Sequence, residues 1–388
     1  MHLPIFDSPN EFYTFYYDES NNHRKFYINE EADNYNVDKD HNKKQKAATN
    51  FMLGGLAHKG ASCAASAADL ITSLKLQKTA DELKFGQIAS GNFDTALKSP
   101  QITHILRWIL DSDLYVHYFN LSLEYWAFID IIDDCVHHCV INGKLIFQNE
   151  KHWREFLDFH KDVLYRLLEI DKAKFLATAK KFDYPKIDGK EREFLGAIVK
   201  LAISRIDILL AVEQSESIAA EIISMRRLAE LLQLSEDIDD MGLTYNDEPG
   251  VLVDGLTIFY DHRGTMFPNS EHVFDDEFSV EEDLAVLNRA RSGGTFKYRF
   301  VNSLDSHLTQ VSDVIAGLFG KYFEFIERNE LDTLLEVKAK FNRFQAETLR
   351  LMKAVIEKSD DESKSFLHYT MTASTHYKHA KFMFPDEA

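Results

Sequence analysis

The stretch FYTFYYDES, residues 12–20, decides the fold, because an aromatic and β-prone run leads directly into Asp18-Glu19-Ser20. Residues of this kind fit a half-buried pleated surface, so 12–17 is expected to form a strand that ends in two carboxylates. A polar break follows, and KFYI at 25–28 is expected to return as the partner of a hairpin. NFMLGGL at 50–56 is expected to be the third strand of a meander, with its glycines marking a bulge or a close approach.

The rest of the chain alternates between strand and helix patterns. Further strands are expected at 114–121, 251–253, 256–260 and 296–301. Helices are expected at 61–80, 92–111, 307–328, 331–358 and 363–380, and an almost continuously helical block at 124–245. This mixture predicts an α/β fold in which helices flank a mixed sheet.

Charge restricts the function. The chain has 44 Lys and Arg against 63 Asp and Glu, which gives a net charge of −19. A protein that holds nucleic acid through a general basic surface has the opposite balance, so a nucleic-acid partner would require a local basic patch or divalent metal ions. The basic residues between 180 and 192 are such a patch, or a solvated loop between helices.

Cysteine content and hydropathy indicate the compartment. Three cysteines, Cys63, Cys135 and Cys139, give no disulfide framework, which favours a reducing environment. The N-terminus has no charged region followed by an apolar run, so no signal peptide is expected. No apolar stretch approaches the ~18 residues that a membrane span needs. We therefore expect a cytoplasmic protein that does not bind membranes.

Carboxylates at strand ends are the first candidates for chemistry. Asp18 and Glu19 close the first expected strand, and Asp261 follows the apolar run LTIFY. Ligands bind at strand ends in open α/β sheets, and carboxylates gathered there are stable mainly when a cation or a proton lies between them. Such hard oxygen ligands suit Mg²⁺ or Mn²⁺. For each residue alone, the alternative is an Asp that caps a turn.

The helix expected from residue 307 carries a second group of polar residues. Gln310 and Asp313 are three positions apart, so they share one helix face. The apolar residues that follow would pack this helix on the sheet, which makes Asp313 a candidate carboxylate ligand. Asp305 and Ser306 precede the helix, and either is a good N-cap.

Glu82 and Lys84 flank Leu83 between two helical stretches. On one side of an extended tripeptide, they could serve a metal ion and a phosphate respectively. The alternative is a solvated turn with an internal salt bridge.

The stretch DIIDDCVHHC, residues 130–139, places acidic and histidine side chains three and four positions apart. Helical pairs of this kind build metal sites in bundles, but no second helix offers a matching Glu-x-x-His pair. The cysteines with flanking Val and Ile favour core packing instead.

Together, the motifs resemble the bacterial domain-of-unknown-function 3800 family, which has a ribonuclease-H-like fold. That family opens with an apolar strand and Tyr-x-Asp-Glu-Ser-Gly, matched by YYDES at 16–20 with Asn21 in place of Gly. Its Glu-x-Lys segment corresponds to residues 82–84. Its Asp-Ser and Gln-x-x-Asp motifs correspond to 305–306 and 310–313. The resemblance covers residues 11–123 and 250–328.

The resemblance implies a carboxylate cluster that binds Mg²⁺ or Mn²⁺. The catalytic residues that it implies are Asp18, Glu82, Asp313 and Lys84. The strand context adds Asp261 as a further catalytic and metal-binding candidate. Asp305 and Glu19 are further candidate metal ligands, and Ser20, Ser306 and Gln310 are candidate substrate contacts.

The resemblance also implies a division of the chain. The first part of the ribonuclease-H-like domain is expected at 1–123, a helical insertion at 124–245, the second part at 246–328, and a helical C-terminal extension at 329–388.

The function implied is hydrolysis of nucleic-acid phosphodiester bonds by a two-metal mechanism, in a setting such as phage defence. Two alternatives stay open. The first is a catalytically inactive ribonuclease-H-like scaffold that binds a protein partner, and the second is a metal-dependent hydrolase of small nucleotides. The helical regions are candidate surfaces for a homodimer or a protein partner.

Overall fold

The computed structural model describes residues 11–22, 25–39, 42–46, 48, 50–76, 81–213, 215–244, 248–291 and 296–385. Its centre is a mixed six-stranded sheet in the order β10-β6-β5-β1-β8-β9. The strands are β1 (Tyr13–Ser20), β5 (Asn50–Lys59), β6 (Leu114–Ser122), β8 (Glu271–Asp275), β9 (Lys297–Val301) and β10 (Leu367–Thr370). β1, β5 and β6 are antiparallel neighbours, whereas β8 runs parallel to β1, β9 to β8 and β10 to β6.

Alternation along β1 assigns its side chains to two faces of the sheet. Phe15 contacts Phe267, the residue that follows α10 (Thr257–Met266), so α10 packs on this face of the sheet. The Ser312 hydroxyl of α12 (His307–Arg328) donates to the carbonyl of Tyr16 at 3.1 Å on the other face. Asp18 therefore lies on the face that α12 covers.

Gly55 explains how closely α12 approaches the sheet. A Cβ at this position would lie 2.3 Å from the Tyr16 carbonyl oxygen and 2.4 Å from the Ser312 side chain. The Ser312 hydroxyl also accepts a hydrogen bond from the Leu56 backbone at 3.2 Å. The close approach expected at the glycine pair is confirmed.

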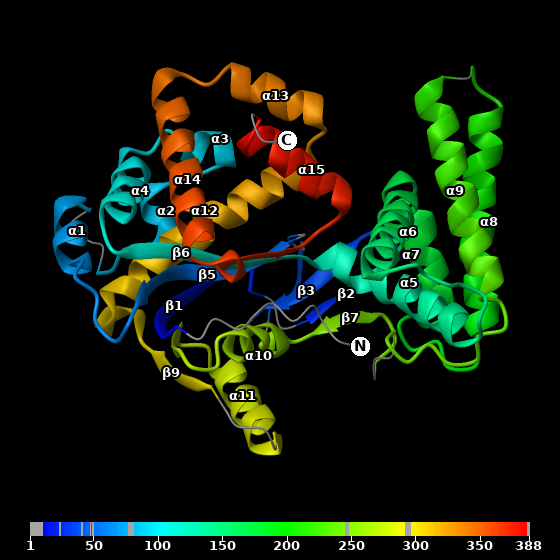
Figure 1. Cartoon of the computed structure of the whole chain (residues 1–388), viewed down its shortest axis with the longest axis horizontal. Coiled ribbons are helices and arrows are strands. Elements are labelled where there is room, and N and C mark those ends of the chain that lie inside the picture. The colour runs from blue at the N-terminus through cyan, green and yellow to red at the C-terminus, as the bar shows by residue number, and fades with distance from the viewer. Residues whose placement is uncertain are drawn as a thin grey trace.

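Helices cover both faces of the sheet (Figure 1). On the side of α12 lie α1 (Ala67–Ser73), α2 (Phe85–Ile88), α3 (Phe93–Ala96), α4 (Pro100–Asp111), α13 (Leu331–Ala339), α14 (Arg343–Glu362) and α15 (Ala373–Met383). The opposite side carries α10 and α11 (Phe278–Ala290). Short 3₁₀ turns occur at Ser303–Asp305 and Lys364–Phe366.

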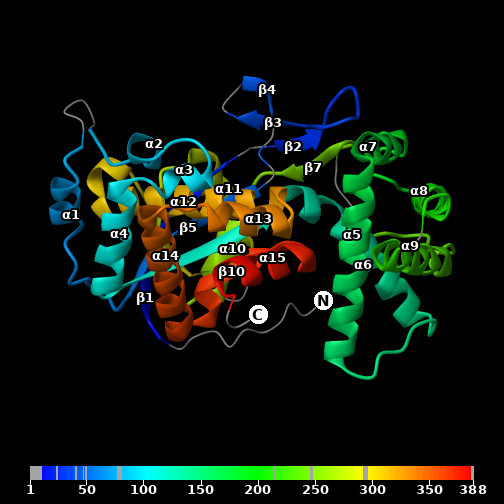
Figure 2. The ribbon, with the colours of Figure 1, turned by 90° about the horizontal axis from the view of Figure 1, so that it is seen from above.

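A second, four-stranded sheet has the order β4-β3-β2-β7. It consists of β2 (Lys25–Ile28), β3 (Tyr35–Lys39), β4 (Asn42–Lys46) and β7 (Val251–Asp254), and Figure 2 shows it to one side of the six-stranded sheet. The expected hairpin between β1 and residues 25–28 is therefore wrong. β2 pairs with β3 and β7, and the meander runs from β1 to β5 and β6.

Between β6 and β7, every described element is helical. The five helices are α5 (Leu123–Ile141), α6 (Glu150–Ile170), α7 (Lys172–Lys181), α8 (Glu191–Leu210) and α9 (Glu216–Leu234). Figure 1 shows them gathered at one end of the molecule, where α8 and α9 form an antiparallel pair.

Residues 256–260 do not form the expected strand. Phe259, Tyr260, Arg263 and Gly264 are buried, whereas Ile258 is exposed, which is the one-sided pattern of a helix. A short apolar run cannot be assigned to strand or helix by periodicity alone. The helix expected at 331–358 is also interrupted, between α13 and α14, and β8 and β10 were not expected.

Candidate functional site

Four carboxylates from four separate segments surround the Lys84 ammonium group. The Lys84 Nζ lies 3.7 Å from Glu82 Oε2, Asp275 Oδ2 and Asp313 Oδ2, and 4.0 Å from Asp18 Oδ2. These four residues are the carboxylate cluster. The structure thus brings together three of the predicted carboxylates and the predicted lysine.

The parallel pairing of β1 and β8 positions two members of the cluster. Tyr17 is paired with Phe274, so Asp18 and Asp275 are the next residues on neighbouring strands. Successive side chains alternate between the faces, so both carboxylates lie on the side of α12. The cluster therefore lies where two parallel strands end, beneath the helix that carries Asp313.

Hydrogen bonds fasten the Lys84 segment to α12. The Asp313 Oδ1 accepts from the Phe85 backbone N–H at 2.5 Å, and the Gln310 Oε1 accepts from the Leu83 N–H at 2.9 Å. Gly317 allows this contact, because a Cβ there would lie 2.5 Å from the Phe85 ring. The backbone on both sides of Lys84 is therefore held by one face of α12.

Gln310 has a structural role. Its Nε2 donates to the Ser303 carbonyl at 2.8 Å, while the Ser303 hydroxyl donates to Glu82 Oε2 at 2.6 Å. Both ends of this buried amide are thus engaged within the protein. Gln310 therefore positions the Glu82 segment, and its contact with a substrate stays a prediction.

Burial makes Asp18 the most strongly perturbed carboxylate of the cluster. The residue is 5% exposed, its Oδ1 accepts from the Glu19 backbone at 2.7 Å, and its Oδ2 has no hydrogen-bond partner among the described residues. Burial first, and then the charges of Glu19, Asp313 and Asp275, raise the pKa of Asp18 well above its usual range. This carboxylate is therefore costly to keep ionised unless a cation is close.

Lys84 supplies that cation. Burial lowers the pKa of Lys84, but the surrounding carboxylates, Asp18 foremost, outweigh it and the pKa is raised. Burial also raises the pKa of Asp275 and of Asp313. The Lys84 side chain keeps 31% of its surface exposed, so it has a path to solvent.

The donor set of the cluster suits a hard divalent cation, but its spacing is that of an ammonium contact. Mg²⁺–oxygen distances are about 2.0–2.1 Å, well below the 3.7–4.0 Å from Lys84 Nζ to the carboxylates. Across the described part of the chain, no group of three or more His, Cys, Asp or Glu is spaced for a metal ion. Metal binding here would require the carboxylates to draw together and Lys84 to move.

Asp261 does not belong to the cluster. It lies on α10, against the opposite face of the sheet, and pairs with Arg291 at 2.5 Å. Glu19 alternates with Asp18 and points toward the same opposite face, where it accepts a hydrogen bond from the Tyr260 hydroxyl. Burial raises the pKa of Glu19 to about 7, against the lowering effect of that hydrogen bond.

The remaining predicted residues surround the start of α12. Asp305 is exposed in the 3₁₀ turn, and Ser306 is the N-cap, accepting from the Thr309 N–H at 3.3 Å. The capping alternative is therefore confirmed for Ser306, whose hydroxyl also accepts from the Thr309 side chain. Ser20 lies beneath Gly320 of α12, two residues beyond Asp18 along β1.

Asp275 was missed because β8 was missed. Val273-Phe274-Asp275-Asp276 repeats the pattern of Tyr16-Tyr17-Asp18-Glu19, in which an apolar pair leads into two carboxylates. That internal similarity was the available signal. β8 has only five residues, too few for its alternation to stand out.

The DIIDDCVHHC segment is structural. Asp133 pairs with Lys161 at 2.7 Å, and Asp134 accepts from the Thr244 backbone at 3.1 Å and its hydroxyl at 2.8 Å. Cys135 and Cys139 are buried free thiols, as the core-packing interpretation predicts.

Several residues of the basic run are also engaged within the protein. Lys180 donates to the carbonyls of Asn29 and Glu30, and Lys190 pairs with Asp183.

Comparison with models of protein families, with curated proteins and with solved structures finds no match to this chain. No helix within the described ranges is long and apolar enough to cross a membrane.

Proposed function

We propose that this chain is a divalent-metal-dependent phosphodiesterase that acts on nucleic acid. The observation that carries the proposal is the convergence of four carboxylates from β1, the turn before α2, β8 and α12 on one cation. Such a convergence of like charges is unfavourable unless a cation is present. A site of hard oxygens at strand ends is suited to Mg²⁺ or Mn²⁺.

The fold adds support. Three antiparallel strands, β6, β5 and β1, are extended beyond β1 by the parallel strands β8 and β9. This arrangement agrees with the ribonuclease-H-like fold that the motifs imply. Fold alone does not establish activity, so the proposal depends on the carboxylate cluster.

Within this proposal, Asp18, Glu82, Asp275 and Asp313 hold the metal ions. Bound divalent cations lower the pKa of an attacking water and stabilise the leaving oxygen of a phosphodiester. Asp18 is the most buried of the four, and its Oδ2 has no hydrogen-bond partner among the described residues, which makes it the best candidate for a metal ligand. Lys84, with its path to solvent, would contact the substrate phosphate.

A second candidate is a catalytically inactive scaffold, and the position of Lys84 favours it. The ammonium group already neutralises part of the cluster, Asp313 accepts a hydrogen bond from the Phe85 backbone, and Glu82 accepts one from the Ser303 hydroxyl. A cluster of this kind can stabilise the fold without binding metal.

Calorimetric titration with Mn²⁺ and Mg²⁺ separates the two candidates. The proposal expects saturable binding that is lost in Asp18→Asn and Asp313→Asn and retained in Asp207→Asn, a matched change at an exposed carboxylate of α8. Metal-dependent cleavage of DNA or RNA oligonucleotides should follow the same pattern. If the chain binds metal and cleaves a small phosphodiester but not oligonucleotides, the substrate is a small nucleotide. Absence of metal binding would favour the catalytically inactive scaffold.

A further inference from the structure

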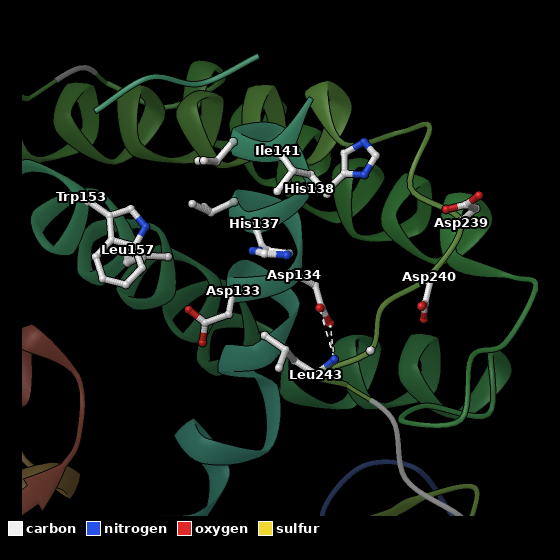
Figure 3. Close-up of a pocket in the computed structure, with 13 residues that line it drawn as sticks. Asp133, Asp134, His137, His138, Ile141, Trp153, Leu157, Asp239, Asp240 and Leu243 are labelled. Atoms are coloured by element: carbon white, nitrogen blue, oxygen red, sulfur yellow. Dashed lines mark hydrogen bonds between the residues drawn. The ribbon is translucent and has the colours of Figure 1, made fainter. Parts of the chain in front are cut away.

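A cavity of about 720 Å³ opens in the helical part of the chain, away from the carboxylate cluster. Figure 3 shows it between α5, which forms the floor, Trp153 and Leu157 of α6 on one side, and Asp239 to Leu243 on the other. This volume is within the range of natural ligand sites. We propose that the cavity is a docking site for a basic amphipathic helix of a partner protein.

The walls of the cavity are preformed by internal contacts. Asp134 accepts hydrogen bonds from the backbone of Leu243 and Thr244, which fixes the 239–243 segment against α5. Asp133 is neutralised by Lys161. These two carboxylates are therefore engaged by the fold, and a ligand would meet an existing groove.

Exposed apolar side chains line the cavity. Ile141, at the end of α5, is 67% exposed, and Val140 and Leu243 are each 41% exposed. Contiguous exposed apolar surface marks interaction sites. The apolar face of an amphipathic helix would cover these side chains.

Charge selects a basic partner. Asp239 and Asp240 are exposed on one wall, and no ion pair within the described ranges neutralises either. α5 ends at Ile141, so the negative end of its dipole also lies at the cavity. A helix that presents apolar side chains to Trp153 and Ile141, and a Lys or Arg to Asp239 and Asp240, fits both features.

The probe for the test is a synthetic helical peptide with leucines on one face and lysines on the other. Its control replaces every lysine with glutamate. Binding to the full chain is followed by anisotropy of the labelled peptide and by tryptophan fluorescence, with Trp153→Phe identifying the signal from the cavity. We expect saturable binding of the lysine peptide alone, weakened by salt.

Variants locate the binding. Ile141→Ser and the double change Asp239→Asn with Asp240→Asn should each weaken binding by about tenfold or more. The control for Ile141→Ser is Ile208→Ser, and the control for the double change is Asp207→Asn with Glu213→Gln. These controls alter exposed residues at or just after the C-terminal end of α8. Equal losses in the controls would show non-specific attraction to an acidic protein and overturn the proposal. Absence of saturable binding, or of a Trp153 signal, would also overturn it.

Discussion

Asp313 contacts both the Lys84 ammonium group and the backbone that follows Lys84. The Lys84 Nζ is 3.7 Å from Asp313 Oδ2, and Oδ1 of the same carboxylate accepts from the backbone of Phe85, the residue after Lys84. One carboxylate of α12 thus holds both the cation and the backbone that presents it. The position of Lys84 is therefore part of the local architecture, and removing its charge tests the cluster without removing the backbone contact.

Replacing Lys84 with Met should destabilise the protein in the absence of metal. Four carboxylates would lose their shared cation, and removing one partner of a buried ion pair costs about 3–5 kcal/mol. Because the Lys84 side chain is 31% exposed, we expect about 2–3 kcal/mol. Urea unfolding in the presence of a chelator measures the loss.

The same Lys84→Met variant should bind Mn²⁺ more tightly than the wild type if metal and ammonium compete for the cluster. Lys340→Met is the control, because the Lys340 side chain is exposed and its ammonium group forms one ion pair among the described residues, with Glu336 at 3.9 Å. Unchanged Mn²⁺ affinity in calorimetry would mean that Lys84 and the metal do not exclude each other.

Asp18→Asn should have opposite effects on stability and on metal binding. The Asp18 Oδ2 is buried without a hydrogen-bond partner among the described residues, and three other carboxylates remain near Lys84. A neutral amide removes a buried negative charge, so the metal-free protein should gain about 1 kcal/mol at pH 8. Thermal unfolding with and without Mn²⁺ checks both effects. A variant that is less stable in chelator, yet still stabilised by Mn²⁺, would contradict this role for Asp18.

Local patterns in the sequence were sufficient for much of the site. The apolar strand before Asp18, the tripeptide at 82–84, and the shared helix face of Gln310 and Asp313 each depend on neighbouring residues. The structure brings these segments together. Asp275 was not predicted because β8 has only five residues and shows little periodicity. The Val-Phe-Asp-Asp pattern at the end of β8 nevertheless repeats that of β1.

Long-range pairing could not be predicted in the same way. β2 follows β1 closely in sequence, which favours a hairpin, yet its partners are β3 and the distant β7. Asp261 was misplaced because an apolar run of five residues fits a strand or a helix equally well. Tyr260, Arg263 and Gly264 are buried together, which is the pattern of a helix. This burial depends on packing against the rest of the fold, so the local sequence does not reveal it.

Gly55→Ala tests the close contact between α12 and the sheet. The added Cβ would meet the Tyr16 carbonyl oxygen at 2.3 Å, and this backbone atom cannot move without disturbing β1. Overpacking of this kind costs about 1–3 kcal/mol, and we expect the upper part of that range. The control is Gly196→Ala in α8, where a Cβ meets nothing within 4 Å and alanine favours the helix. Equal stability of Gly55→Ala and the wild type in urea would refute the contact.

Glu327 should make the stability of the protein depend on pH near neutrality. Burial raises the pKa of Glu327 to about 7 from an ordinary value of 4.5, and hydrogen bonds from the hydroxyls of Ser122 and Tyr165 oppose the shift only in part. A raised pKa means that the folded state favours the protonated carboxyl. The stability that this preference adds to the folded state is therefore fully present below pH 4.5 and is lost as the pH rises through 7.

Glu327→Gln removes this titration while keeping the shape of the side chain. We expect the wild type to lose up to about 3 kcal/mol of unfolding free energy relative to Glu327→Gln between pH 5 and pH 8. Urea unfolding at both pH values measures the difference, and Glu336→Gln, at an exposed carboxylate, is the control. Buried carboxylates remote from Glu327 cancel in the comparison, whereas the difference includes the repulsion between Glu327 and the charges of Glu124 and Glu169. Parallel pH profiles for the wild type and Glu327→Gln would show that Glu327 ionises in the folded protein as readily as in the unfolded chain.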